Sequence, residues 1–287
     1  MELQQLRYVI AVAEEQNFTR AAARCHVVQS ALSHQIKALE REIGVDLFAR
    51  TSRRVELTAA GHAFLERARE SVGFAERAIE EANAASGVVQ GTVTVGMIPT
   101  VTAIDVPRAL GELRAAHPLV QVRLQVGDSR DFIAQLADGR MDIAILGLSD
   151  RITPAKVATR VLAEEQLVAV VGSEHRFTER RTLRLRDLAD ETFADFPAGT
   201  SGRAQSDLAF ADAGVTRRVM FDSMSPQMTL DLVRQNLAVA LLSPGTVPTD
   251  PSLVSIPVVD GPRRIEYLAW SEFNPSPAAK ALLALLA

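Results

Sequence analysis

The sequence of 287 residues predicts an α/β chain overall: an N-terminal winged helix-turn-helix, then one long helix, then a larger C-terminal α/β region. Three observations support this prediction. Two helical patterns meet at a break within residues 18–44, and a proline-free segment at 59–86 repeats its apolar residues at helical spacing. Apolar strand-like runs then alternate with helical runs to the C-terminus, as in sheets covered by helices.

The helix-turn-helix is predicted from the spacing of apolar residues. We expect Thr19 to cap a first helix that contains three small alanines at 21–23. After a break at 26–28, a second apolar stripe is formed by Leu32, Ile36, Leu39 and Ile43. Gly44 is expected to end this helix. The opposite face carries Ser30, Ser33, His34, Lys37 and Arg41, and a helix with a hydrogen-bonding outer face fits the major groove of DNA.

The charge distribution agrees with DNA binding only locally. Residues 20–54 contain seven basic and three acidic residues, whereas the whole chain has a formal net charge of −4. A basic patch on an acidic protein is typical of a phosphate-contacting surface. A solvated surface with incidental charge is the alternative.

A wing is predicted directly after the second helix. Residues 51–54 have the composition of a turn, and Val55 and Leu57 alternate with polar neighbours. Two short strands joined by a turn with Arg53 and Arg54 can lie along a phosphate backbone or reach the minor groove. The apolar residues of these strands are expected to pack in the core.

These segments resemble the N-terminal domain of LysR-type transcriptional regulators, and the resemblance extends in layout over the full chain. It is carried by Phe18-Thr19-Arg20-Ala21-Ala22, Gln29-Ser30-Ala31-Leu32-Ser33-His34-Gln35-Ile36, Leu39-Glu40, Gly44-Val45-Asp46-Leu47-Phe48-Ala49-Arg50 and Leu57-Thr58-Ala59-Ala60-Gly61. Ser30 stands where the family commonly has proline, and His34 where a basic residue is common. The expected DNA-binding residues are Thr19, Arg20, Gln29, Ser30, Ser33, His34, Lys37, Arg50, Arg53 and Arg54.

Composition places the chain among cytoplasmic globular proteins. No apolar stretch approaches the roughly 18 residues that span a bilayer. The N-terminus is not a secretory signal, because its apolar positions Leu3, Leu6, Ile10 and Ala13 have helical spacing and the run continues into acidic residues. The single cysteine, Cys25, excludes an intrachain disulfide. A packing role for Cys25 is favoured over a reactive thiol.

The helix expected at residues 59–86 carries a narrow apolar seam. Its members at three-four spacing are Leu65, Ala68, Val72, Ala75, Ile79 and Ala82. Such a seam favours pairing with the same helix of a second subunit, and the resemblance implies that role. Packing of the seam on its own domain is the alternative. A homodimer, or a homotetramer as the resemblance allows, would read two half-sites about one helical turn apart.

The C-terminal region is expected to alternate strands and helices in parallel sheets. Strands are predicted at 91–97, 120–126, 142–147, 167–172, 237–242 and 265–270, and helices at 106–116, 131–138, 201–213, 226–235 and 278–286. The resemblance implies two lobes like those of periplasmic solute-binding proteins, with chain crossings near 161–164 and 263–267. The domains are therefore expected at 1–58 (winged helix-turn-helix), 59–88 (linker helix) and 89–287 (effector-binding domain). Lobe I would comprise about 89–161 and 267–287, and lobe II about 162–266.

A small effector is expected between the lobes, near strand ends and helix N-termini. The expected effector-binding residues are Thr100, Ser129, Thr200, Ser201, Arg203 and Ser225. Arg203 would anchor an anionic effector such as a carboxylate. A neutral pocket in which the hydroxyls only cap helices is the alternative.

Other functional classes find little support in the sequence. Residues 98–101 resemble peroxide-sensing members of the family, but the region of the sensing thiol contains Thr200-Ser201-Gly202, so that route is excluded. No catalytic motif or metal-ligand spacing occurs, and no enzyme activity, cofactor or metal is expected. A solute-binding transport component would leave the N-terminal sixty residues unexplained. An architectural DNA binder without a ligand remains an alternative. RNA polymerase is a further candidate partner of such a regulator.

Overall fold

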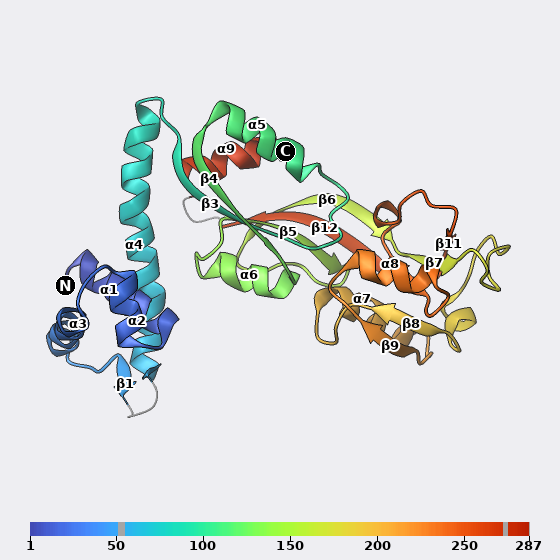
Figure 1. The fold of residues 1–287 in the computed structure, drawn as a ribbon, viewed down its shortest axis with the longest axis horizontal. Helices are drawn as coiled ribbons and strands as arrows, with labels where there is room; N and C mark the ends of the chain where they lie inside the picture. Colours follow the sequence, from blue (N-terminus) through green and yellow to red (C-terminus); the bar gives the residue numbers. More distant parts are fainter. Residues whose placement is uncertain (51–54, 272–274, 287) are drawn as a thin grey trace. The chain divides into compact units, whose positions relative to one another are not determined.

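A computed structural model describes residues 1–50, 55–271 and 275–286, without the side chain of Arg50. The chain folds as two compact units, Met1–Val88 (unit 1) and Val89–Ala287 (unit 2) (Figure 1). No helix within the described ranges is long and apolar enough to span a bilayer.

Unit 1 is a winged helix-turn-helix, as predicted. Its elements are α1 (Leu3–Glu15), α2 (Phe18–Arg24), α3 (Gln29–Ile43), β1 (Phe48–Arg50), β2 (Val55–Leu57) and α4 (Ala59–Ala85). The stripe predicted for α3 is buried, and Gly44 ends the helix in the left-handed conformation. Strands β1 and β2 pair in antiparallel orientation. The predicted cap of α2 was wrong: Asn17 caps it, because the Oδ1 atom of Asn17 accepts the backbone N–H groups of Thr19 (2.9 Å) and Arg20 (3.0 Å).

A buried carboxylate joins α3 to the wing. Glu40 is only 8% exposed, and its Oε1 atom accepts the backbone N–H groups of Leu47 (2.9 Å) and Phe48 (3.2 Å). These bonds supply an acceptor to two backbone N–H groups that would otherwise be buried without a hydrogen-bond partner at the start of β1. The position of the wing relative to α3 is therefore fixed from inside the unit.

The apolar seam of α4, predicted as a dimerisation surface, divides into two parts within unit 1. Leu65, Ala68 and Val72 are buried inside unit 1, where Ala68 and Val72 pack with Leu6 of α1. These three side chains are already covered, because α1 needs an apolar partner for its own stripe. Farther along the helix, Ala75 is half-buried, and Ile79 is 65% exposed.

Lobe I of unit 2 is built on a five-stranded mixed sheet in the order β4-β3-β5-β12-β6. The strands are β3 (Gln90–Met97), β4 (Leu119–Val126), β5 (Ile143–Ser149), β6 (Ala158–Gln166) and β12 (Arg263–Trp270), and the helices are α5 (Val106–Ala116), α6 (Ser129–Ala137) and α9 (Pro277–Leu285). Alternate residues of β5 face opposite layers. Ile143 and Ile145 pack with α5 and α9, whereas Leu146 and Leu148 pack with α6 (Figure 1).

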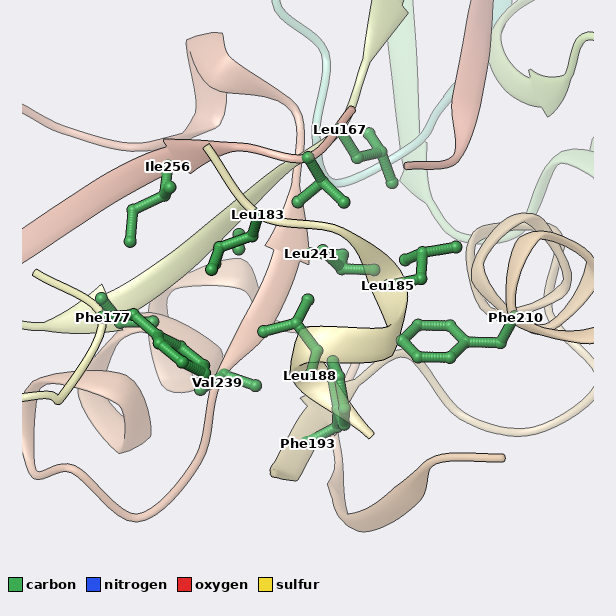
Figure 2. Close-up of a cluster of buried hydrophobic side chains, with 13 residues drawn as sticks. Leu167, Phe177, Leu183, Leu185, Leu188, Phe193, Phe210, Val239, Leu241 and Ile256 are labelled. Atoms are coloured by element: carbon green, nitrogen blue, oxygen red, sulfur yellow. The ribbon is translucent and has the colours of Figure 1, made fainter. Parts of the chain in front are cut away.

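Lobe II surrounds a second core. Its strands are β7 (Val168–Gly172), β8 (Thr192–Asp195), β9 (Arg218–Asp222), β10 (Ala240–Leu242) and β11 (Leu253–Pro257), and its helices are η1 (Leu185–Leu188), α7 (Ser201–Asp212), α8 (Pro226–Arg234) and η2 (Pro244–Thr246). Strand β7 lies between β10 and β11 in antiparallel orientation, and β8 and β9 are parallel. Figure 2 shows the core cluster, in which Phe193 and Phe210 meet edge to face.

Two expectations about unit 2 were wrong. The sheet of lobe I is mixed rather than parallel, because β12 runs antiparallel to both β5 and β6, and the β10-β7-β11 sheet of lobe II is antiparallel. The segments expected as crossings, 161–164 and 263–267, lie inside β6 and β12, which pair along their full length. The chain leaves this strand pair at residues 166–167 and returns at 262–263. We therefore define lobe II as residues 167–262 and lobe I as the remainder of unit 2.

The two glycines of α4 offer a test of packing in unit 1. A Cβ atom at Gly61 would lie 2.1 Å from the backbone oxygen of Leu47, whereas one at Gly73 would have nothing within 4 Å. We expect Gly61→Ala to destabilise unit 1 by roughly 1–3 kcal/mol through overpacking. Gly73→Ala should stabilise it by up to about 1 kcal/mol through helix propensity.

Both variants can be measured by far-UV circular dichroism during denaturation. Trp270, the single tryptophan, lies in unit 2 and gives an internal reference that should not move. Equal stability of the two variants would contradict the packing described for the start of α4.

Candidate functional sites: an exposed helix face and a pocket between two lobes

The exposed face of α3 carries the side chains predicted for DNA contact. Gln29, Ser30, His34 and Lys37 are exposed, and Ser33 is half-buried. The buried stripe of the same helix packs in the core of unit 1, so this polar face is held rigidly outward. Val28 precedes the helix and supplies no side-chain cap. The first turn of α3 therefore keeps its positive end available to an anion such as a phosphate.

Part of the basic patch is already paired within unit 1. Thr19 and Arg20 are exposed, but the Nε atom of Arg20 donates to Glu15 Oε2 at 3.2 Å. Arg24 forms an ion pair with Glu14 at 2.7 Å. Of the predicted wing arginines, Arg50 lies at the end of β1 and its side chain is outside the described atoms, as are residues 53 and 54 altogether. The exposed basic side chains of α3 itself are Lys37 and Arg41, and Lys37 lies nearer the start of the helix.

Unit 2 contains a pocket between its lobes, with ≈ 490 Å³ of empty space including open solvent. Its lining is mostly apolar, with polar groups at a few points. The lining residues are Ile98, Pro99, Thr100, Gly127, Asp128, Ser129, Gly147, Leu167, Phe196, Thr200, Gly202, Gln205, Met224, Leu241, Leu242, Ser243 and Arg264. A concave, mostly apolar lining with a few convergent polar groups is typical of small-ligand binding.

The structure brings three of the six predicted effector residues into the lining. Thr100, Ser129 and Thr200 are there, and Ser201 lies beside the pocket, hydrogen-bonded to Asp128. The Oγ atom of Ser129 is engaged with the backbone N–H (3.0 Å) and carbonyl (3.1 Å) of Gly147. Thr200 caps α7 by accepting the N–H of Arg203.

Arg203 and Ser225 do not line the pocket. The Nε atom of Arg203 donates to Asp207 Oδ1 at 3.1 Å, and its Nη1 atom donates to the carbonyl of Phe196 at 3.3 Å. The predicted anion anchor is therefore held by partners of lobe II. Ser225 caps α8, and its Oγ atom accepts the N–H of Met228 at 3.3 Å.

The basic residue in the pocket wall is Arg264, which the sequence reasoning missed. Its side chain is 5% exposed, and its guanidinium donates to Thr100 Oγ1 (2.8 Å), Glu165 Oε2 (2.7 Å) and Glu266 Oε2 (3.0 Å). A usable signal existed in the alternation of β12. Arg264, Glu266 and Leu268 share one side of the strand, so the two charged residues continue a buried row.

This cluster also joins the lobes. Ser243 of lobe II donates its hydroxyl proton to Glu165 Oε2 of lobe I at 2.5 Å. Burial raises the pKa of Glu165, but the Ser243 hydrogen bond and the Arg264 charge outweigh it, so the pKa is lowered from its usual value. Glu165 is therefore a carboxylate at neutral pH, and two acidic residues surround one arginine.

An exposed polar helix face in unit 1 and a mostly apolar pocket between the lobes of unit 2 define a class: a DNA-binding regulator that carries its own small-molecule domain. Comparison with known proteins gives the family. Residues 3–62 match the bacterial regulatory helix-turn-helix protein of the lysR family, and residues 86–287 match the LysR substrate binding domain. The chain belongs to the LysR family and is a LysR-type DNA-binding transcriptional regulator with an effector-binding domain.

Relatives match along nearly the full chain. The regulator ShiR of Corynebacterium glutamicum is 34% identical, over 99% of this chain and 97% of its own. A full-length single-residue variant of OxyR from Pseudomonas aeruginosa superposes with a TM-score of 0.78 at 27% identity, covering 100% of this chain and 94% of that one. Full-length CbnR in complex with its target DNA superposes with a TM-score of 0.65 at 26% identity, covering 100% and 99%.

The likeness to OxyR does not extend to a thiol in unit 2. The chain has one cysteine, Cys25, which is a free and half-buried residue of unit 1. Burial raises the pKa of the Cys25 thiol, which disfavours the reactive thiolate. These observations support packing as the role of Cys25.

Proposed function

We propose that α3 enters the major groove of an operator and that the pocket of unit 2 binds the small molecule that controls the regulator. The observation that carries the first part is the rigidly held outer face of α3, with Gln29, Ser30, His34 and Lys37 exposed. Ser33 adds a polar group at the edge of the same face. Thr19 and Arg20 at the start of α2, and the wing arginines Arg50, Arg53 and Arg54, are proposed to contact the backbone or the minor groove.

The effector is proposed to be small and largely apolar, with hydrogen-bonding groups at a few points. The apolar walls contributed by Leu167, Phe196 and Leu241 support this, as does the absence of Arg203 from the lining. Arg264 is the basic side chain in the lining, and two acidic side chains already bind its guanidinium. An additional anion beside it would face an excess of negative charge.

Ligand binding is proposed to shift the population of lobe arrangements and so to change the bending of bound DNA. Smooth bending of a site of this kind costs on the order of 1–6 kcal/mol. A ligand that distinguishes two arrangements by a few kcal/mol can supply a difference of that order. Ligand binding can therefore be coupled to DNA bending without any chemical reaction.

The protein is proposed to act without catalysis. Among the described residues, no group of three or more histidine, cysteine or acidic side chains could hold a metal ion. The proposed location is the cytoplasm, where the operator DNA lies, and RNA polymerase is a proposed partner at the promoter.

We also propose a homo-oligomer in which the second half of α4 forms the subunit contact. Ile79 is 65% exposed on this half, whereas the first half is covered by α1. An exposed isoleucine on a helix with an apolar seam favours burial against a second copy. A dimer would place two copies of α3 on two-fold-related half-sites.

The DNA-binding proposal is tested with Lys37→Ala. Loss of one phosphate-contacting charge should weaken specific and non-specific binding together and reduce the slope of log K against log salt by about 1. The measurement is fluorescence anisotropy with DNA from upstream of the protein's own gene, over a series of salt concentrations. Lys280→Ala, which removes a charge from α9 of unit 2, is the matched control and should behave as the wild type.

Unchanged affinity and slope for Lys37→Ala would contradict contact of this face with phosphate. Loss of specificity at unchanged non-specific affinity would indicate that Lys37 contacts a base edge and not a phosphate.

The oligomer proposal is tested with Ile79→Glu. A charge at an apolar contact must be desolvated without a partner, so we expect this variant to sediment as a smaller species than the wild type. Ala63→Glu adds the same charge at an exposed position outside the seam and should leave the assembly unchanged. Identical sedimentation of Ile79→Glu and the wild type would reject this contact.

A further inference from the structure

A carboxylate of the protein itself lies in the wall of the pocket and bridges the two lobes. Asp128 of lobe I caps α6, and its Oδ1 atom accepts the N–H of Arg130 at 3.0 Å. Its Oδ2 atom accepts the N–H of Ser201 at 2.6 Å, and Oδ1 accepts the Ser201 hydroxyl at 3.2 Å. Ser201 is the first residue of α7 in lobe II.

The Asp128 carboxylate therefore joins the N-terminal ends of two helices, one from each lobe. Helix N-termini attract anions because their first N–H groups have no partner within the helix. The Asp128 side chain is 13% exposed and Ser201 is 5% exposed, so little water competes for these bonds. A ligand carboxylate placed between these two helix ends would need the same donors that Asp128 already uses.

A second contact of α7 supports a closed arrangement of the lobes. Gln205, one turn after Ser201 and 4% exposed, donates from Nε2 to the carbonyl of Gly147 in β5 at 3.1 Å. Farther along the helix, Asp212 pairs with Arg151 of lobe I. One face of α7 thus lies against lobe I, and Asp128 holds the end of that face nearest the pocket.

We propose that Asp128 is the residue that sets the charge selectivity of the effector pocket. As a tethered carboxylate it occupies the anion position between α6 and α7, holds the lobes together without a ligand, and excludes small carboxylates from that position. The proposal rests on the proposed function of the pocket as the effector site. It assigns the wild-type pocket to effectors that present no carboxylate to the position between α6 and α7.

The experiment replaces the tethered carboxylate by a free one. The full-length variant Asp128→Ala is unfolded thermally while the fluorescence of Trp270, in β12 of lobe I, is recorded. Loss of the cap and of the bonds between the lobes should lower the transition by roughly 3–6 °C. Sodium acetate at concentrations on the order of 50 mM should restore about half of that shift by binding to the folded state only.

Three controls separate anion binding from other effects. Sodium chloride at equal ionic strength and acetamide, the uncharged analogue, should not restore the transition. Asp105→Ala removes a cap of the same kind from α5, at a position that does not line the pocket. It should lose stability without recovering it in acetate. Asp128→Ser removes the charge but keeps a hydroxyl that can cap α6. This variant replaces Asp128→Ala in the assay if Asp128→Ala does not fold.

Acetate that stabilises both Asp128 variants no more than sodium chloride would overturn the proposal and leave Asp128 as a helix cap only. Acetate that stabilises the wild type as strongly as the variants would also overturn it, because the position would then be open. Selective rescue of the Asp128 variants supports it. No DNA is present in this assay, so its failure is distinct from a failure of the pocket to control DNA binding.

Discussion

The buried guanidinium of Arg264 is the interaction on which the organisation of unit 2 depends. It lies on β12, one of the two paired strands that carry the chain between the lobes, and it binds Glu165 of β6 and Glu266 of its own strand. Glu266 also accepts the backbone N–H groups of Thr102 and Ala103, and Glu165 accepts the hydroxyl of Ser243. A buried arginine without these acids would be strongly destabilising, so the cluster constrains both lobes and the pocket wall together.

Carboxylates at junctions recur in both units. Glu40 accepts two backbone N–H groups at the start of the wing, Glu266 accepts two in the loop after β3, and Asp128 accepts one from each of two helices. In each case a charged acceptor satisfies donors where one element meets another. The wing and the walls of the pocket are thereby held by polar contacts, while the apolar clusters supply the bulk of the packing.

Helix α3 could be predicted from its periodic apolar stripe and strand β5 from its continuous apolar run. Four strands were missed: β8 has only four residues, and β6, β9 and β11 lie at sheet edges, although the edge strands β4 and β10 were predicted. Edge strands carry polar residues on their solvent side and lose the continuous apolar run. The apolar seam of α4 could be predicted from its spacing. The spacing does not show which of its residues are covered by α1 and which stay exposed.

The sequence predicted several residues that line the candidate pocket, but it did not predict which charged side chains lie in its wall. Thr100, Ser129 and Thr200 follow strands or cap helices, and their sequence context indicates that placement. Arg203 follows the expected strand end, but its guanidinium binds Asp207 and the carbonyl of Phe196 instead of lining the pocket. Arg264 and Glu165 meet only because β6 and β12 pair in one register, and a pairing across about a hundred residues leaves no local signal.

Occupation of the pocket is expected to alter the binding of DNA, and this expectation can be measured directly. A panel of small metabolites is first searched for compounds that raise the unfolding transition reported by Trp270. Footprints of the full-length protein upstream of its own gene and of the adjacent divergent gene are then compared with and without them. We predict that a selected compound shortens or shifts the protected region. A compound that stabilises unit 2 and leaves the footprint unchanged would contradict this coupling.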